Sequence, residues 1–331
     1  MEYFLLIIVV CIILYVLGNI FPNGGPSGHL QDLEAKRDLE SRSQIQDICD
    51  RLDLTEIGID NFPIEYSSHW IPKRTGGRRK LHIPSDDLKN RQKTILHSIL
   101  YKAKFHPFCY GFRKHKSIVD NARPHCNSAV VIKLDIKNFF PSITEKHVEA
   151  AFANLGWLPE PVKKLTRMCC YQGALPQGAP TSPAVSNLVL KNLDGRLSQL
   201  AARNYAIYTR YADDITFSLN EDKKSTIRAL IKITQLELAE EGFLLNFKQG
   251  KIRVLRRHQH QEICGITVNT DKPTLSRKKR RLLRSVKHRL NNDIPATMTG
   301  EQLEGWENFK SMVDAEPEKS SVKQSIKQAA S

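Results

Sequence analysis

The chain lacks the cysteine pattern of a disulfide or zinc framework. Its seven cysteines form no C-x-x-C pair, and their odd number excludes a fully paired disulfide set. This usage fits a reducing cytosol. The adjacent Cys169 and Cys170 also lack the spacing of zinc ligands, so we interpret them as small apolar residues of a core.

Charged residues are absent from a long stretch near the beginning of the chain. Between Tyr3 and Phe21 there is no Asp, Glu, Lys or Arg, and Leu, Ile and Val dominate the segment. A run of this length and apolarity is sufficient to cross a bilayer. We therefore expect an uncleaved transmembrane anchor, with the rest of the chain in the cytoplasm. A cleaved signal peptide is the alternative, although Glu2 stands where a positive charge is usual.

Acidic residues are outnumbered by basic ones. The 331 residues include 35 Asp and Glu against 50 Lys and Arg, which gives a net charge of +15. Clustered cations gain free energy by releasing counterions from a phosphate backbone, so nucleic acid is the first candidate partner and a membrane surface is the second. With 40% apolar residues, the chain is long enough to bury a large core.

No internal repeat and no regular strand–helix alternation is evident, which favours an α+β fold. Residues 22–28 are rich in Pro and Gly and predict a linker. Residues 71–84 predict two strands around Gly76 and Gly77, and the β-branched run at 129–136 predicts a buried strand. Residues 205–219 predict two more strands that meet near Asp213.

Two adjacent acids occupy that last turn, in the sequence Tyr211-Ala212-Asp213-Asp214. An Asp-Asp pair alone is most often an ordinary exposed turn. Asp135, however, ends another predicted strand and supplies a third carboxylate, and such a group is stable only beside a cation. Hard oxygen ligands select Mg²⁺, with Mn²⁺ as the alternative. A pair of such ions activates a 3′-hydroxyl for nucleotidyl transfer.

Three boxes now carry a family resemblance. Residues 211–218 (YADDITFS) resemble the YADD box of reverse transcriptases of the retron type. Residues 134–143 (LDIKNFFPSI) resemble the first catalytic box of these enzymes, and residues 173–183 (GALPQGAPTSP) resemble their P-Q-G box. The likeness extends over roughly residues 45–312. It implies an RNA-directed DNA polymerase with the fingers, palm and thumb of a right hand.

The resemblance also assigns roles around the acids. It implies that Asp135 and Asp213 hold two metal ions directly, with Asp214 in support and the carbonyl oxygen of Ile136 within reach. Phe140 matches the aromatic gate under the sugar, which favours deoxynucleotides, whereas Phe139 is expected in the core. The remaining substrate-binding residues are Lys73 and Arg79, from the pattern K-x-x-G-x-x-R, together with Gln177 and Gly178.

Asn121-Ala-Arg-Pro-His125 matches the N-A-x-x-H signature of retron enzymes. The expected role of Asn121 and His125 is to contact RNA or to position the sheet. Two boxes depart from the family pattern. Ile263 and Cys264 replace Val and Thr of the V-T-G box, and Gln249 occupies the place of the usual lysine near the acids. Lys248 is therefore only a candidate general acid for pyrophosphate.

Residues 277–289 predict a basic helix with one apolar face. Its packed face would belong to a thumb, and its cations would follow the phosphates of a template–primer duplex. A solvated basic helix is the alternative. The cations expected to bind nucleic acid are Arg277, Lys278, Arg281, Arg284 and Lys287.

The sequence thus predicts a membrane-anchored retron reverse transcriptase that copies a partner non-coding RNA into multicopy single-stranded DNA from dNTPs. By resemblance, it takes part in anti-phage defence with a toxin or effector protein. The alternatives are an abortive-infection or group II intron-like reverse transcriptase, and a catalytically silent RNA-binding protein tethered to a membrane. The expected divisions are 1–21 (anchor), 22–44 (linker and helical lead-in), 45–270 (fingers and palm), 271–312 (thumb) and 313–331 (flexible tail).

Overall fold

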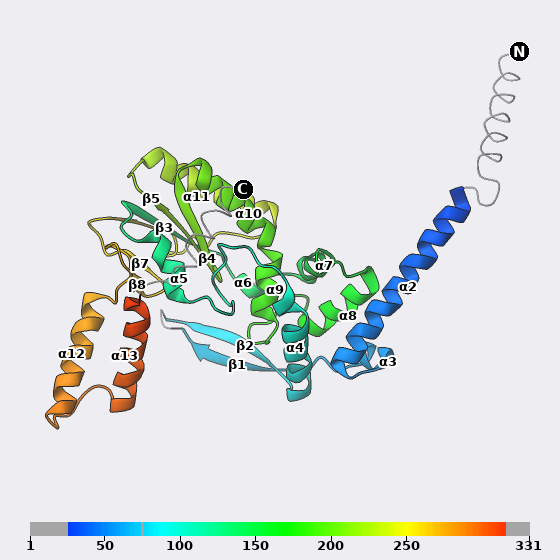
Figure 1. The fold of residues 1–331 in the computed structure, drawn as a ribbon, viewed down its shortest axis with the longest axis horizontal. Coiled ribbons are helices and arrows are strands. Elements are labelled where there is room, and N and C mark those ends of the chain that lie inside the picture. The colour runs from blue at the N-terminus through cyan, green and yellow to red at the C-terminus, as the bar shows by residue number, and fades with distance from the viewer. Residues whose placement is uncertain (1–25, 74–75, 316–331) are drawn as a thin grey trace, which may run out of the picture.

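The computed structural model describes residues 26–73 and 76–315. The fold mixes helices and strands, as the sequence predicts (Figure 1). The predicted anchor, residues 1–21, and most of the predicted tail lie outside the described residues. Among the residues that are described, none of the helices combines the length and the apolarity needed to span a bilayer.

A four-stranded antiparallel sheet forms the centre of the molecule. Its strands lie in the order β4 (Ala206–Tyr211), β5 (Asp214–Leu219), β3 (Val130–Asp135) and β6 (Arg253–Arg256). All residues of β3 are buried except the half-buried Lys133. A strand that is covered on both faces has a continuous apolar sequence, because side chains on both sides are buried. The sequence therefore predicts β3 correctly.

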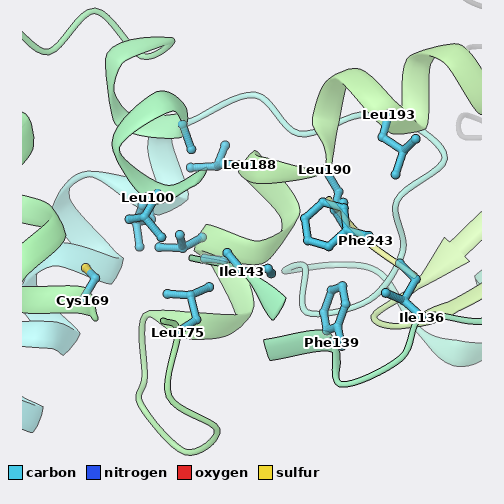
Figure 2. Packing of buried hydrophobic residues seen from close by; sticks show 14 of the residues in the cluster. Leu100, Ile136, Phe139, Ile143, Cys169, Leu175, Leu188, Leu190, Leu193 and Phe243 are labelled. Atoms are coloured by element: carbon cyan, nitrogen blue, oxygen red, sulfur yellow. The ribbon is translucent and has the colours of Figure 1, made fainter. Parts of the chain in front are cut away.

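Successive residues of β3 point to opposite faces of the sheet and enter two different cores. Val130, Ile132 and Leu134 pack in the main core, whereas Val131 packs in a second core. Figure 2 shows part of the main core, where Ile136 and Phe139, which follow β3, lie among buried side chains from other elements. The end of β3 is therefore fixed by packing.

The main core is covered by helices that each bury an apolar stripe. In α8, for example, Val162, Leu165 and Cys169 recur at helical spacing and are buried. The helices that contribute to this core are α2 (Pro26–Leu52), α3 (Glu56–Asp60), α4 (Asp86–Ser98), η1 (Leu100–Lys102), α6 (Phe139–Ser142), α7 (Glu145–Ala153), α8 (Pro159–Cys169), α9 (Ser182–Val189), α10 (Lys191–Arg203) and α11 (Lys224–Glu240).

The second core joins the other face of the sheet to the C-terminal helices. Val131 and Leu255 of the sheet pack there with Leu283 and Val286, the buried residues of the predicted basic helix. The helices and strands that contribute to this core outside the sheet are α5 (Ile118–Ala122), β7 (Glu262–Ile263), β8 (Ile266–Thr267), α12 (Arg277–Asn291) and α13 (Gly300–Asp314). The short helix η2 (Arg123–His125) follows α5 directly. In Figure 1, α12 and α13 form a helical hairpin beside β7 and β8.

The predicted glycine hairpin is confirmed as β1 (Tyr66–Pro72) and β2 (Arg78–Pro84). Its first strand begins earlier than the sequence suggests, because residues 67–70 are polar or exposed and give no burial signal. The turn is closed by the Lys73 N–H, which donates to the Gly77 carbonyl at 2.9 Å. Most side chains of this hairpin are exposed.

Candidate active site

Three carboxylates meet at one end of the central sheet. Asp135 is the last residue of β3 and lies opposite Asp214, the first residue of β5, in the antiparallel register. Asp213 occupies the turn between β4 and β5, and its carbonyl oxygen accepts a hydrogen bond from the Ile136 N–H at 3.0 Å. Residues almost eighty positions apart in the sequence are thus joined through their backbones.

The negative charges at this end of the sheet oppose one another. Burial, together with the charges of Asp214 and Asp135, raises the pKa of Asp213 to about 6. Burial also raises the pKa of Asp214, with Lys133 and Lys251 opposing the shift. Bringing a divalent cation close would relieve this repulsion, and carboxylate oxygens are the donors that Mg²⁺ prefers. The residues present therefore fit a divalent metal.

The Asp135 carboxylate has two side-chain partners. The Asn246 amide donates to one oxygen at 2.7 Å, and the Lys251 ammonium donates to the other at 2.5 Å. The Asn246 N–H also donates to the Asp135 carbonyl at 2.8 Å. In this arrangement, no three His, Cys, Asp or Glu side chains of the described residues form a ready metal-ligand group.

Lys251, rather than Lys248, is the lysine that reaches the acids. Lys248 is exposed, and its contact with Asn246 is made by its backbone N–H at 3.3 Å. The chain turns through residues 247–250 and brings the side chain of Lys251 back to β3. Lys251 was missed from the sequence, and Lys248 as the general acid for pyrophosphate stays a prediction.

A buried arginine stabilises the turn that carries Asp213. Arg210 is fully buried and forms a bidentate ion pair with Asp194, with both N–O distances at 2.7 Å. Its Nη1 also donates to the Ala212 carbonyl at 3.0 Å and to Asn187 at 3.1 Å. Ala212 has a φ of 58°, a left-handed conformation that non-glycine residues seldom adopt. The hydrogen bond from Arg210 helps to hold that strained turn.

Gly111 packs against the same turn. A Cβ atom added to Gly111 would lie 2.5 Å from the Ala212 nitrogen, so a side chain there would displace the backbone next to Asp213. The Gly111 carbonyl accepts a hydrogen bond from Asn187 at 2.8 Å, which links it to the Arg210 network. No local pattern in the sequence points to Arg210, Asn187 or Gly111, because their roles depend on contacts between distant segments.

The predicted gate residue lies in an aromatic group close to the acids. Phe139 is buried, as expected for a core residue, and Phe140 is half-buried. Phe112 lies between Phe140 and Tyr211, with ring centroids 6.1 and 6.4 Å away. Phe112 was missed from the sequence, and it supports the ring of Phe140 from the side of the YADD turn.

The predicted substrate-binding hairpin and the P-Q-G loop are joined. The His82 N–H of β2 donates to the Gln177 carbonyl at 2.9 Å. A Cβ atom on Gly178 would lie 2.6 Å from the His82 oxygen. Glycine at this position therefore allows β2 to approach the loop. Arg79 is half-buried in β2, and Lys73 is exposed next to the turn.

Asn121 and His125 are buried, so the structure does not place them where RNA could contact their side chains. His125 is 0% exposed and Asn121 is 1% exposed. The two ring nitrogens of His125 hydrogen-bond the hydroxyls of Thr209 and Ser218 at 2.8 and 2.7 Å. The other expectation, that this motif positions the sheet, fits these contacts.

The predicted basic helix is present as α12. Its five expected nucleic-acid-binding cations are exposed, while Leu283 and Val286 are buried. Lys287 is paired with Glu307 of α13 at 2.8 Å, and the ammonium of Lys279 lies 3.7 Å from the ring centre of Trp306. The helix therefore presents a strongly positive surface on one side and packs on the other.

Comparisons with known proteins agree with the geometry of the acids. The profile of the family described as reverse transcriptase (RNA-dependent DNA polymerase) matches residues 71–283. The chain is 35% identical to the retron Ec86 reverse transcriptase of Escherichia coli over 237 residues, which cover 72% of each protein. It is 38% identical to the retron Mx65 reverse transcriptase of Myxococcus xanthus over 241 residues, which cover 67% of this chain and 55% of that protein.

Among solved structures, apo telomerase from Candida tropicalis, truncated from its C-terminal domain, aligns with a TM-score of 0.46 at 11% identity, over 64% of this chain and 55% of that one. The family profile alone spans well over half of the chain, and it includes all three acids. The chain therefore belongs to the reverse transcriptases, the RNA-directed DNA polymerases, and within them to the retron type.

Proposed function

We propose that this reverse transcriptase copies a partner non-coding RNA into multicopy single-stranded DNA by two-metal nucleotidyl transfer at Asp135, Asp213 and Asp214. Retron reverse transcriptases work with a non-coding RNA template and make DNA from dNTPs. The observation that carries the proposal is the register that sets Asp135 opposite Asp214, beside the Asp213 turn.

Each part of the site has a role in this reaction. Mg²⁺ ions held by Asp135, Asp213 and the Ile136 carbonyl, with Asp214 in support, would lower the pKa of the primer hydroxyl and neutralise the leaving pyrophosphate. Lys251 balances the charge of Asp135. Phe140, supported by Phe112, would exclude a 2′-hydroxyl by contact with the sugar.

The wider architecture supports the same reading. We infer that the central sheet is the palm, that the β1–β2 hairpin belongs to the fingers, and that α12 and α13 form the thumb. Lys73 and Arg79 would bind the triphosphate, because lysine and arginine donors match phosphate oxygens. The P-Q-G loop, which contacts β2 through Gln177 and Gly178, would align the template with that triphosphate.

The test is incorporation of dNTPs on an RNA template by the wild type and by Asp213→Asn, with Mg²⁺, with Mn²⁺ and with EDTA. We expect wild-type activity that EDTA abolishes, and a loss of at least about 100-fold in the variant, as for removal of a principal charge-stabilising group. Failure of the wild type on every template, including its cognate RNA, would instead support a silent RNA-binding protein.

We further propose that the chain is anchored in the membrane by residues 1–21, faces the cytoplasm, and acts in anti-phage defence with an effector or toxin protein. The support is the apolar composition of that segment, which carries no charged side chain from Tyr3 to Phe21, and the retron relationship. Fractionation of the native cell tests the anchor. Recovery of all the protein in the soluble fraction would contradict it.

A further inference from the structure

The segment from Asn121 to Asn127 lies between the strands that carry the acids and the elements of the second core. Its first contact is with the sheet. His125 bridges Thr209 of β4 and Ser218 of β5, the two strands that flank the Asp213–Asp214 turn. One buried ring thus connects the two strands on either side of the Asp213 turn to the end of η2.

The same segment contacts the β7–β8 turn. The Asn121 amide donates to the sulfur of Cys264 at 3.5 Å. The Asn127 N–H donates to the Val268 carbonyl, just after β8, at 2.9 Å. The side-chain oxygen of Asn121 is buried and has no hydrogen-bond partner among the described residues, so the amide is held in place by packing and by its single donor contact.

A third contact reaches the C-terminal end of the α12–α13 hairpin. The Arg123 guanidinium donates to the carbonyl of Ala315, immediately after α13, at 2.9 Å. Val119 and Ala122 of α5 pack in the second core with buried residues of α12 and α13. The segment therefore touches the palm strands, the β7–β8 turn and the end of the α12–α13 hairpin within seven residues.

We propose that residues 121–127 form a joint that fixes the α12–α13 hairpin relative to the catalytic acids, so that Asn121, Arg123 and His125 are positioning residues for the template–primer duplex. The inference rests on the proposed function, in which α12 binds that duplex. It gives the N-A-x-x-H signature a role that needs no contact with RNA. Loosening the joint weakens the hold on the duplex while leaving the nucleotide site intact.

The test uses the full-length protein and two variants that remove one contact each, Asn121→Ala and Arg123→Ala. The control is Gln44→Ala in α2, which removes two side-chain hydrogen bonds in the main-core half of the molecule, one to the Gly156 carbonyl and one from the Leu158 N–H. Two quantities are measured: the dissociation rate of a fixed RNA–DNA duplex in EDTA, and the KM for dNTP with Mg²⁺.

We expect both variants to release the duplex about 2- to 10-fold faster, the effect of one lost hydrogen bond. The KM for dNTP should stay within about 2-fold of the wild type, and Gln44→Ala should change neither value. Arg123→Lys retains a donor and should restore slow release. A uniform loss of folded protein would lower the active fraction without changing the dissociation rate or the KM. Faster duplex release at an unchanged KM for dNTP therefore indicates a positioning role rather than a loss of stability.

Three results overturn the inference. Release at the wild-type rate in both variants, from a wild type that binds the duplex normally, contradicts the joint and leaves the proposed function standing. An equal rise of duplex release and dNTP KM places the effect at the acids rather than at the hairpin. Failure of the wild type to bind any RNA–DNA duplex overturns the proposed function as well, and the two failures are thereby distinguished.

Discussion

At the end of β3, the charge of Asp135 is balanced by Lys251 and its orientation is set by Asn246. Removing Lys251 would leave Asp135 facing two other acids with one cation fewer. We expect Lys251→Ala to lower kcat about 10- to 100-fold, because hydrogen bonds to charged groups contribute about 1.5–3 kcal/mol. Steady-state incorporation of dNTP on a primed RNA template measures the effect.

The control for this prediction is Lys248→Ala, which removes an exposed lysine from the same loop. It should stay within about 2-fold of the wild type, as surface changes usually do. Equal losses in the two variants would mean that the general charge of the loop matters, rather than the contact with Asp135.

His125 makes stability depend on pH. Burial lowers its pKa from 6.5 to about 3, whereas in the unfolded chain the imidazole titrates near its ordinary value. Between pH 3 and 6.5 the unfolded state therefore binds the extra proton, and the folded state loses stability as the pH falls through this window. The slope from this one residue is about 1.4 kcal/mol per pH unit well below pH 6.5.

Urea unfolding at pH 5.0 and pH 7.5 tests this for the wild type and for His125→Asn. The variant should be less stable than the wild type at pH 7.5, because Thr209 and Ser218 lose their partner. Its stability should fall less between the two pH values. The change in unfolding free energy between the two pH values is compared for the wild type and the variant. The contribution of the acids cancels in this comparison, because they titrate in both proteins. An identical pH dependence would contradict the buried neutral histidine.

The roles of some single residues in the site can be predicted from the sequence, and those of others cannot. Asp135, Asp213 and Asp214 could be found because strand ends and a short turn bring them together through local rules. Lys251 and Arg210 could not, since their contacts with Asp135 and Asp194 exist only in the folded chain. A polar residue with no periodic pattern gives no local signal of its partner.

Among the elements, the contact between β2 and the P-Q-G loop depends on one glycine. Gly178 has a φ of 135° and no room for a Cβ atom beside the His82 oxygen. We expect Gly178→Ala to push β2 away from the loop. Since Arg79 lies on β2, the KM for dNTP should rise about 10-fold, the size of effect of a distortion worth about 1.4 kcal/mol. Single-nucleotide incorporation measures it.

Gly195→Ala is the matched control for this change. Gly195 lies inside α10, where an added Cβ atom meets nothing within 4 Å. Alanine should leave dNTP binding unchanged there and raise stability by up to about 1 kcal/mol, the difference in helix propensity. A normal dNTP KM in Gly178→Ala would show that the loop and the hairpin are not coupled.

The elements that were predicted best are those with a strong burial pattern. The sequence predicts β3 from its continuous apolar run, because this strand is covered on both faces, and it predicts α12 from a single apolar stripe, because this helix is covered on one face. The two-residue strands β7 and β8 escaped prediction because so short a segment carries no period. The position of α5 between β4 and the β7–β8 turn is likewise a property of the assembled fold.

At the scale of the whole molecule, the excess of positive charge has a measurable consequence. The exposed cations of α12 would release counterions from the phosphates of a bound duplex, so affinity should fall steeply with salt concentration. The double variant Arg281→Ala, Arg284→Ala removes two of these cations while keeping the buried Leu283 and Val286. We expect the slope of log affinity against log salt to become shallower by about one unit for each arginine.

The control for the α12 variant is a second double variant that has the same net charge but loses its cations from another helix. Arg228→Ala, Lys232→Ala removes two exposed cations from α11, whose buried residues belong to the main core rather than to the core beneath α12. If affinity followed total charge alone, both double variants would shift the slope alike. A duplex bound along α12 instead predicts a change in the first variant and almost none in the second, because charges more than about 10 Å from the phosphates are screened at 0.1 M salt.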